Sequence, residues 1–448
     1  MKNYALLGVL SVASLVVGAG SLACGSTVGE PAPATTPPAV VDPAAPAQTD
    51  PPAATAPAPM LDHGAVSTKY PAFTPAMGQL RSNGGSVLKN PVIVSVTWPG
   101  DTRVADLEML GDTVGAGAYW KAVTSEYGSL AAISGTDNHL HLPDAAPTSI
   151  SDTALATLVQ TSLGKTDGTA WPVPATGDPV YILYLPETTD LILQGQSACA
   201  QGVGGYHDNV TVNGRNFAYA IVPSCSDFAA VTLSASHELA EAATDPYPHA
   251  RPAWSGFRDT DLAWDMFQQF QSENGDACEF YRDSELAPGE SDVMFTVQRQ
   301  WSNQSGKAGH DPCVPAFKNT VYFNATPIKL EDINADLSTL VGDPKGTDIQ
   351  PTKGFKVKVG ETRQIPIGFY SDGPMAAWTI KAIAGGIAGG HGSASSLDLA
   401  LDVTSGQNGE MAYLSVTVNA AGKTNTELVT IVSQHAGTSH YMPILIGN

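Results

Sequence analysis

The sequence has few charged residues and, in particular, little positive charge. Only 15% of its 448 residues are charged, and 22 Lys and Arg stand against 43 Asp and Glu, a formal net charge of −21 at pH 7. Nucleic acids and anionic membranes are bound mainly through positive charge, so this balance argues against both as partners. The chain also lacks a phosphate-binding glycine loop, a Rossmann fingerprint and a reactive-cysteine context.

The N-terminal apolar run is too short for a membrane span. It covers residues 4–17 after Met1-Lys2 and predicts a signal peptide over residues 1–23. Ser21-Leu22-Ala23 offers the small residues that a general signal peptidase needs. Alternatively, Cys24 is the lipid-modified cysteine of a bacterial lipoprotein, although Ser21 stands where Leu is preferred. We expect an exported bacterial protein, anchored to the outer or cell membrane through a lipid on Cys24 or released outside the cell.

Cysteine is scarce, and its count is odd. The chain has five, and in an exported protein an odd count leaves one unpaired. Cys24 is the natural one to carry a lipid, and the other four can form two disulfides in an oxidising compartment. Four cysteines allow three pairings. Proximity in the sequence favours Cys199–Cys225 and Cys278–Cys313.

Residues 24–60 are rich in Pro, Ala and Thr, which predicts an extended tether.

After the tether, the pattern changes to alternating strands and helices. Apolar runs predict buried strands at 91–98, 180–185 and 217–222, and helical periodicity predicts helices at 101–127 and 151–163. This alternation over residues 61–317 resembles the zincin layout, a mixed twisted sheet with an active helix behind it.

Residues 318–448 show short alternating strands separated by Gly, Asn and Asp clusters, which predicts an immunoglobulin-like β-sandwich. His391, His435 and His440 fall among its predicted turns, so we expect all three at the surface. The predicted fold class is therefore α+β: an α/β zincin-like domain followed by an all-β sandwich.

One predicted helix carries an unusual acidic face. Ser226 or Asp227 can cap its start, and Pro246 ends it. An apolar stripe at helical spacing faces the core; its residues are Val231, Ala235, Leu239 and Ala242.

On the opposite face, His237 and Glu241 are four residues apart, and Glu238 and Asp245 add carboxylates on neighbouring turns. Like charges at this spacing repel each other, and the helix C-terminus disfavours negative charge. A bound cation would remove both penalties. A solvated acidic face explains the pattern equally well.

The stretch His237-Glu238-Leu239-Ala240-Glu241 departs from the His-Glu-x-x-His motif of zinc peptidases, because Glu241 replaces the second histidine. A carboxylate can bind Zn²⁺, and a carboxylate-rich shell also suits Ca²⁺, Mn²⁺ or Mg²⁺. Zn²⁺ is the expected metal, with Ca²⁺ or Mn²⁺ as alternatives.

Further motifs flank this helix in a fixed order. Gly205-Tyr206-His207 precedes it, and Trp254, the segment 273–278 (Glu-Asn-Gly-Asp-Ala-Cys) and the segment 298–303 before Cys313 follow it. The ordered set resembles the Exordium-like (phosphate-induced) secreted family over residues 185–313, less than half of the chain. The resemblance implies a zincin-like region and defines no activity.

We predict that His237 and Glu241 are metal ligands and that Asp276 or Glu273, held by the disulfide of Cys278, supplies a third. Asp276 could instead only form an Asx-turn after Gly275.

Glu238, beside the predicted ligands, is the expected general base that activates a metal-bound water. His207 is expected to be a further ligand or to stabilise an oxyanion; alternatively, it only hydrogen-bonds a turn. Trp254 and Trp264 either line a substrate cleft or pack in the core.

An alternative cation site involves Asp259, Asp261 and Asp265, which lie close together but do not follow an EF-hand pattern.

The leading functional prediction is a metal-dependent hydrolase of the zinc metallopeptidase kind, acting on a peptide or a cell-surface polymer. The first alternative is a non-catalytic cell-surface protein that binds carbohydrate or protein on the same scaffold. The second is a protein with a structural Ca²⁺ ion.

Overall fold

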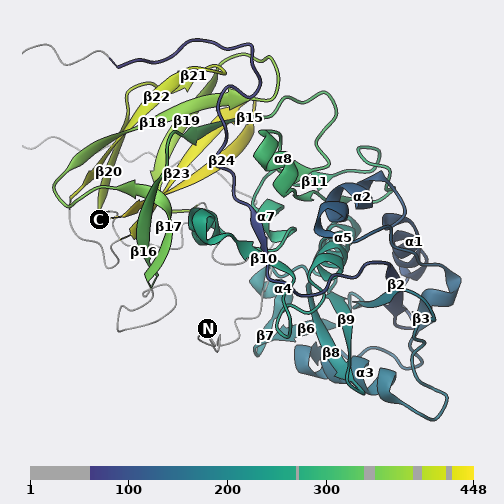
Figure 1. Cartoon of the computed structure of the whole chain (residues 1–448). Helices are drawn as coiled ribbons and strands as arrows, with labels where there is room; N and C mark the ends of the chain where they lie inside the picture. Colours follow the sequence, from purple (N-terminus) through teal and green to yellow (C-terminus); the bar gives the residue numbers. More distant parts are fainter. Residues whose placement is uncertain (1–60, 269–271, 338–348, 387–395, 420–425, 448) are drawn as a thin grey trace, which may run out of the picture. The chain divides into compact units, whose positions relative to one another are not determined.

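The computed structural model describes residues 61–268, 272–337, 349–386, 396–419 and 426–447 (Figure 1). The predicted signal peptide, the tether and Cys24 lie outside these residues. Helices and strands both contribute, so the predicted α+β class is confirmed. Within the described ranges, no helix is long and apolar enough to cross a membrane.

A five-stranded sheet organises the first part of the chain. Its strands, in spatial order, are β3 (His139–His141), β2 (Pro91–Thr97), β5 (Asp178–Tyr184), β9 (Arg215–Val222) and β8 (Tyr206–Val212). The first four are parallel, and β8 runs antiparallel to β9 at one edge. Parallel strands covered on both faces need nearly continuous apolar sequences, which explains why the sequence predicted β2, β5 and β9 correctly.

Helices cover both faces of this sheet. Alternate strand residues point to opposite faces, so Ile93 and Val180 join one hydrophobic cluster while Val94 and Tyr181 join another. The first cluster contains α1 (Val104–Val114), α2 (Ala118–Thr124) and α5 (Phe228–Thr244), and the second contains α3 (Asp152–Gly164). Ser151 caps α3 as predicted, because its side chain accepts a hydrogen bond from the Ala154 N–H.

The prediction of a single helix over residues 101–127 was wrong. The chain breaks at Gly115 and Gly117 into α1 and α2, and a short 3₁₀ turn (Ser125–Tyr127) follows. The carboxylate of Asp292 accepts hydrogen bonds from the Ala118 and Tyr119 N–H groups at the start of α2. A side chain at Gly117 would collide with that carboxylate. Helical periodicity alone does not reveal a cap supplied from residues so distant in the sequence.

Short elements connect the rest of this part. A three-stranded sheet comprises β4 (Ser149–Ser151), β6 (Asp190–Leu193) and β7 (Gln196–Ser197). Two-stranded pairs are β1 (Leu80–Ser82) with β10 (Trp254–Phe257), β11 (Glu285–Leu286) with β12 (Val297–Gln298), and β13 (Gln300–Trp301) with β14 (Cys313–Val314). The short helices are α4 (Ala198–Gln201), α6 (Leu262–Phe267), α7 (Asp276–Glu279) and α8 (Asn303–Ala308).

Both disulfides form with the predicted pairing. Cys199 is bonded to Cys225, and Cys278 is bonded to Cys313. Disulfides persist in oxidising compartments, so the two bonds are consistent with an exported protein.

Two further sheets form the last part of the chain. The four-stranded sheet has the order β15 (Phe323–Pro327), β18 (Thr362–Ser371), β22 (Met411–Val418), β20 (Leu397–Leu401). The six-stranded sheet has the order β16 (Glu331–Asp336), β17 (Ile349–Lys356), β24 (Thr438–Gly447), β23 (Thr426–His435), β19 (Trp378–Ala384), β21 (Ser405–Gly406). Side chains of both sheets share one hydrophobic cluster. The domain boundary predicted at residues 317/318 falls between β14 and β15 and stays a prediction.

His440 contradicts the expectation that it lies at the surface. Its side chain on β24 is only 3% exposed, and its ring centroid lies 4.5 Å from that of Tyr322 and 4.8 Å from that of Phe323. Burial opposes charging of the ring and lowers the pKa of His440 to about 4. His435, also expected at the surface, is partly exposed on β23, and His391 lies outside the described residues.

This pKa predicts acid sensitivity. An unfolded histidine has a pKa of about 6.5, so the unfolded chain gains a proton at His440 before the folded protein does. Stability should be complete above about pH 6.5 and decrease by about 3 kcal/mol as the pH falls toward 4. In urea unfolding curves at several pH values, His440→Phe should lack this decrease and His435→Phe should retain it. An unchanged acid decrease in His440→Phe would contradict the assignment.

Candidate metal centre

Helix α5 places the acidic residues of the site. Asp227 caps its start, since its side chain accepts a hydrogen bond from the Ala230 N–H, and the helix ends at Thr244 as predicted. The predicted apolar stripe is buried in the cluster beneath the sheet.

The polar face of α5 is buried as well as its apolar stripe. Glu238 is 2% exposed, and His237 and Glu241 are each 3% exposed. The alternative of a solvated acidic face is therefore wrong. Burying ionisable groups is costly unless they are paired or bind a cation.

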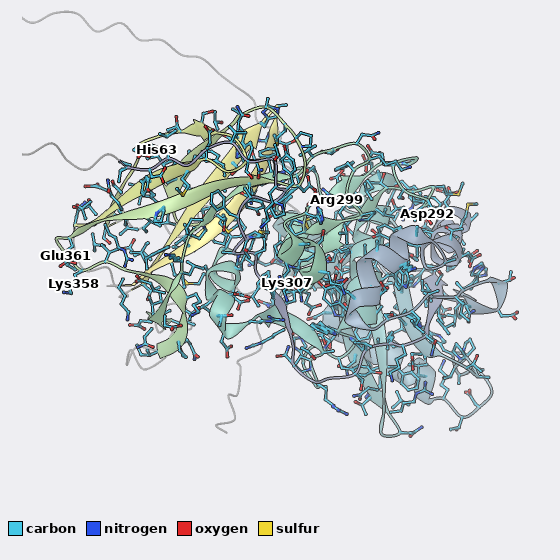
Figure 2. All side chains as sticks on the ribbon, turned by 45° about the horizontal axis from the view of Figure 1, so that its top comes forward. His63, Asp292, Arg299, Lys307, Lys358 and Glu361 are labelled. Carbon is cyan, nitrogen blue, oxygen red and sulfur yellow. A yellow bond between two sulfur atoms is a disulfide. The ribbon has the colours of Figure 1, made fainter. Side chains whose placement is uncertain are left out.

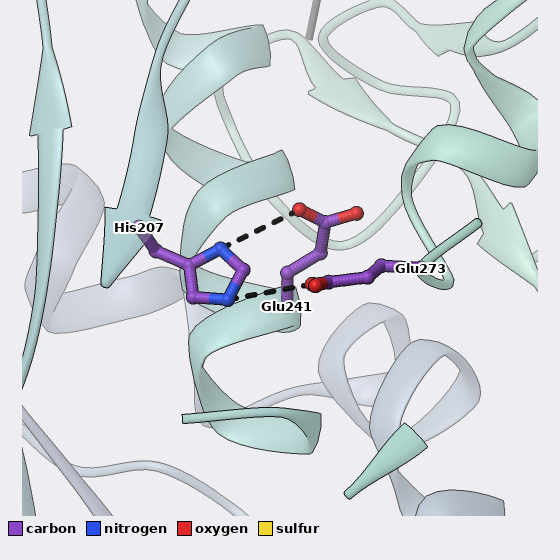
Figure 3. A group of neighbouring side chains, drawn as sticks. All are labelled: His207, Glu241 and Glu273. Carbon is purple, nitrogen blue, oxygen red and sulfur yellow. Dashed lines mark ion pairs between the residues drawn. The ribbon is translucent and has the colours of Figure 1, made fainter. Parts of the chain in front are cut away.

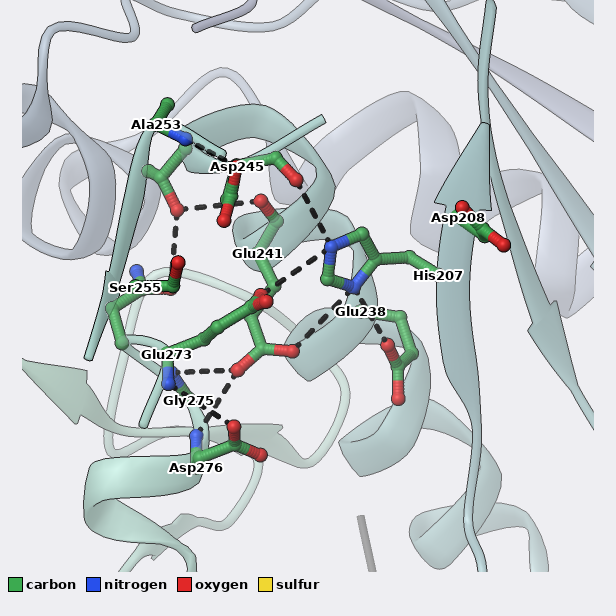
Figure 4. Close-up of polar contacts among 12 residues, drawn as sticks. His207, Asp208, Glu238, Glu241, Asp245, Ala253, Ser255, Glu273, Gly275 and Asp276 are labelled. Carbon is green, nitrogen blue, oxygen red and sulfur yellow. Dashed lines mark hydrogen bonds and ion pairs between the residues drawn. The ribbon is translucent and has the colours of Figure 1, made fainter. Parts of the chain in front are cut away.

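Glu241 lies at the centre of this network (Figure 4). Its Oε1 accepts hydrogen bonds from the Gly275 and Asp276 N–H groups, both at 3.1 Å. Its Oε2 lies 3.0 Å from His237 Nε2 and 3.6 Å from His207 Nδ1. One carboxylate thus holds the start of α7 and faces both histidines.

Gln298 fixes the ring of His237 through its Nδ1 atom, the ring nitrogen that faces away from the carboxylates. The Gln298 Nε2 donates to the Gly275 carbonyl at 2.8 Å, so its Oε1 is the atom that accepts from His237 Nδ1 at 2.9 Å. The proton on Nδ1 leaves Nε2 as the ring atom that faces the carboxylates, and Asp276 Oδ1 lies 3.7 Å from it. Such support of the remote ring nitrogen is typical of metal-binding histidines.

His237 Nε2 and Glu241 Oε2 form a short ion pair across one turn of α5. Despite the 3.0 Å separation, Nε2 has no hydrogen-bond partner among the described residues.

His207 reaches the site from the edge strand β8. A two-residue turn at Asn213 and Gly214, both with positive φ, joins β8 to β9 and sets the register that pairs His207 with Ala220. His207 Nδ1 lies 3.4 Å from Glu238 Oε2, and Nε2 lies 3.1 Å from the Asp245 carbonyl oxygen. His207 therefore belongs to the acidic cluster, and its role is more than the support of a turn.

Glu273 and Asp276 come from the loop before α7 and from its first residue. Glu273 Oε2 lies 3.3 Å from His207 Nε2, and the Glu273 N–H donates to Asp276 Oδ2 at 3.1 Å. The two side chains are 5% and 4% exposed. Both predicted candidates for a third ligand thus lie in the cluster, and the disulfide of Cys278 anchors α7.

The electrostatics of the cluster follow from this burial. Burial alone lowers the pKa of His207, but its hydrogen bond to Glu238 and the charge of Glu241 raise that pKa to about 9. Burial likewise opposes charging of His237, and the charge of Glu241 nevertheless raises its pKa well above the usual value. Burial and the neighbouring charge of Glu241 raise the pKa values of Glu273 and Asp276 well above the usual range. These groups would release protons on binding a cation.

Two overlapping groups have the geometry to hold a metal ion. One comprises His237, Glu238 and Glu241, and the other comprises His207, Glu241 and Glu273; within each group, ligand atoms lie within 4.8 Å of one another. All six predicted site residues belong to this cluster.

Two residues that matter here were missed by sequence reasoning. Gln298 orients His237, and the buried Arg299 fixes the same segment through bonds to the Asp283 and Pro315 carbonyls. Figure 2 labels Arg299 among the side chains of the described residues. Gln298 appeared only as part of a family-like segment, and nothing in its spacing indicates a contact with a helix 61 residues earlier in the sequence.

Other candidates have structural roles. Trp264 is 2% exposed and packs against Trp301 with ring centroids 5.1 Å apart, in agreement with the predicted alternative of packing in the core. Half-buried Trp254 packs edge-on against Tyr127. The alternative Ca²⁺ site finds no support among the described residues: Asp259 pairs with Arg81, and Asp261 and Asp265 accept backbone N–H groups.

The close approach of the loop to α5 requires glycine at position 275. An added Cβ would lie 2.7 Å from Glu241 Oε1 and 2.8 Å from His237 Cε1. We expect Gly275→Ala to destabilise the protein by about 1–3 kcal/mol, because the crowded side chains must shift. Gly164→Ala is the control, since its Cβ would meet Val212 at an ordinary 3.6 Å. Equal midpoints of urea unfolding for the two variants would contradict the crowding.

Comparison with protein-family models and with curated proteins finds no match for this chain. The resemblance to the Exordium-like family therefore stays a prediction based on its motifs.

Proposed function

We propose that the protein is an exported, metal-dependent hydrolase that cleaves peptide-type bonds, with α5 as the active helix of a zincin-like domain. The observation that carries the proposal is the buried group of His237, Glu238 and Glu241, whose ligand atoms converge on one helix face, with His237 Nε2 3.0 Å from Glu241 Oε2. The proposal includes an immunoglobulin-like sandwich after this domain and a lipid anchor on Cys24.

His237, Glu241 and Asp276 would hold the cation. Two zinc ligands at the usual 2.0–2.1 Å in a tetrahedral shell lie about 3.3 Å apart. The separations of His237 Nε2 from Glu241 Oε2 and Asp276 Oδ1, 3.0 and 3.7 Å, bracket that value. Zn²⁺ is the proposed metal. When bound, it supplies Lewis-acid polarisation of a carbonyl and lowers the pKa of water.

Glu238 would act as the general base. It lies one residue after His237 and forms a ligand-distance group with His237 and Glu241. Its Oε2 accepts from His207 Nδ1 at 3.4 Å, which orients the carboxylate and compensates its charge. Glu238 would accept the proton of the attacking water and pass it to the leaving amine.

A second candidate function is a structural cation without catalysis. The observation that favours it is the burial of the cluster: His207, the most exposed of the six residues, is only 8% exposed. A cation there would join α5, β8 and α7, and Ca²⁺ would suit the oxygen-rich shell.

Removing the central carboxylate tests the metal centre. Glu241→Gln keeps an oxygen for the Gly275 and Asp276 N–H groups but loses the charge. We expect the purified variant to lose bound metal in elemental analysis, while Glu285→Gln, at an exposed site, retains it. Equal metal content in all three proteins would reject the centre.

Substituting the proposed base separates catalysis from structure. Glu238→Gln should keep the metal and lose about 10²–10⁴-fold in hydrolysis of a quenched-fluorescent peptide library, because general-base catalysis contributes about that factor. Unchanged cleavage would reject Glu238 as the base. A metal-loaded wild type that cleaves no peptide but unfolds at lower temperature after chelation would favour the structural cation.

A further inference from the structure

We propose that the cluster binds a second divalent cation, held by His207, Glu273 and Glu241 (Figure 3). This inference rests on the proposed function, because Glu241 also belongs to the first metal position.

The three side chains come from separate elements and converge. His207 lies on β8, Glu241 on α5, and Glu273 in the loop before α7. His207 Nδ1 lies 3.6 Å from Glu241 Oε2, and His207 Nε2 lies 3.3 Å from Glu273 Oε2. One ligand atom from each residue lies within 4.8 Å of the other two. This group shares Glu241 with the group of His237 and Glu238 and contains neither of those two residues.

Unpartnered oxygen atoms point independently to a ligand. Glu273 is 5% exposed, and its Oε2 accepts no hydrogen bond from the described residues even though His207 Nε2 is 3.3 Å away. Asp245 is fully buried, and its Oδ2 also lacks a hydrogen-bond partner there. An unsatisfied buried carboxylate oxygen is costly, and a cation beside it removes that cost.

The balance of charged groups supports the same conclusion. The cluster joins five carboxyl groups to two imidazoles; the carboxyl groups are Glu238, Glu241, Asp245, Glu273 and Asp276. Among the described residues, every ion pair of Glu238, Glu241, Glu273 and Asp276 is with His207 or His237. No Lys or Arg of the described residues pairs with these four carboxyl groups, and a divalent cation would compensate carboxylate charge there.

The carboxylate of Glu241 is placed to contact both proposed cations. Its Oε1 is committed to two backbone N–H groups, so its Oε2 is the atom nearest to both imidazoles, at 3.0 and 3.6 Å. Paired-metal hydrolases hold two cations close together to stabilise attacking and leaving oxygens. The second position combines one nitrogen with carboxylate oxygens, a shell that suits Mn²⁺ better than the softer metals.

Metal stoichiometry tests the proposal. The full chain, saturated with Mn²⁺ and freed of excess metal, should contain two equivalents by elemental analysis. Glu273→Gln should contain one. Glu285→Gln is the control, because Glu285 is an exposed carboxylate outside both groups, and it should retain two.

The outcomes separate this inference from the proposed function. One equivalent in both wild type and Glu273→Gln, abolished by Glu241→Gln, would overturn the second position and leave the first standing. No bound metal in the wild type would overturn both. Two equivalents that persist in Glu273→Gln would also overturn the assignment to Glu273.

Electron paramagnetic resonance supplies a readout that depends on the distance between the ions. Two neighbouring Mn²⁺ ions couple, so the wild-type signal per ion should weaken as loading rises from one to two equivalents. Glu273→Gln should show the hyperfine-split spectrum of an isolated Mn²⁺ ion at every loading. An uncoupled spectrum from wild type with two equivalents would place the second ion elsewhere and overturn the proposal.

Discussion

The carboxylate of Glu241 is the contact on which the site depends. One of its oxygens binds the two N–H groups at the start of α7, and the other faces both histidines. Because the group is fully buried, its charge acts on its neighbours with little screening by water. Together with burial, it therefore shifts the pKa values of the surrounding groups, and it holds the start of α7, which supplies Asp276.

The fold brings this charge and its partners together from distant parts of the chain. An edge hairpin supplies His207, helix α5 supplies the central carboxylates, and the loop after the helix supplies Glu273 and Asp276. Each segment is anchored close to the site: Cys225 is bonded two residues before the Asp227 cap, and Cys278 is bonded within α7. A cluster of like charges needs such anchors, because mutual repulsion otherwise separates the segments.

Much of this arrangement could be predicted from local pattern. The strands β2, β5 and β9 were evident because buried parallel strands are continuously apolar. The cap and end of α5 followed from Asp227 and Pro246, and the disulfide pairs followed from their closeness in the sequence. All six candidate site residues meet in one cluster. Metal binding and catalysis by that cluster remain predictions.

By itself, the sequence determined the periodic elements, the capping residues and the residue types that can bind a cation, because these depend on neighbours within a few positions. Only the tertiary structure decided that the acidic face of α5 is buried, that Gln298 orients His237 and that His440 lies in a core. It also divided the predicted helix of residues 101–127, through Asp292. These outcomes depend on contacts between residues far apart in the chain, whose positions no local spacing encodes.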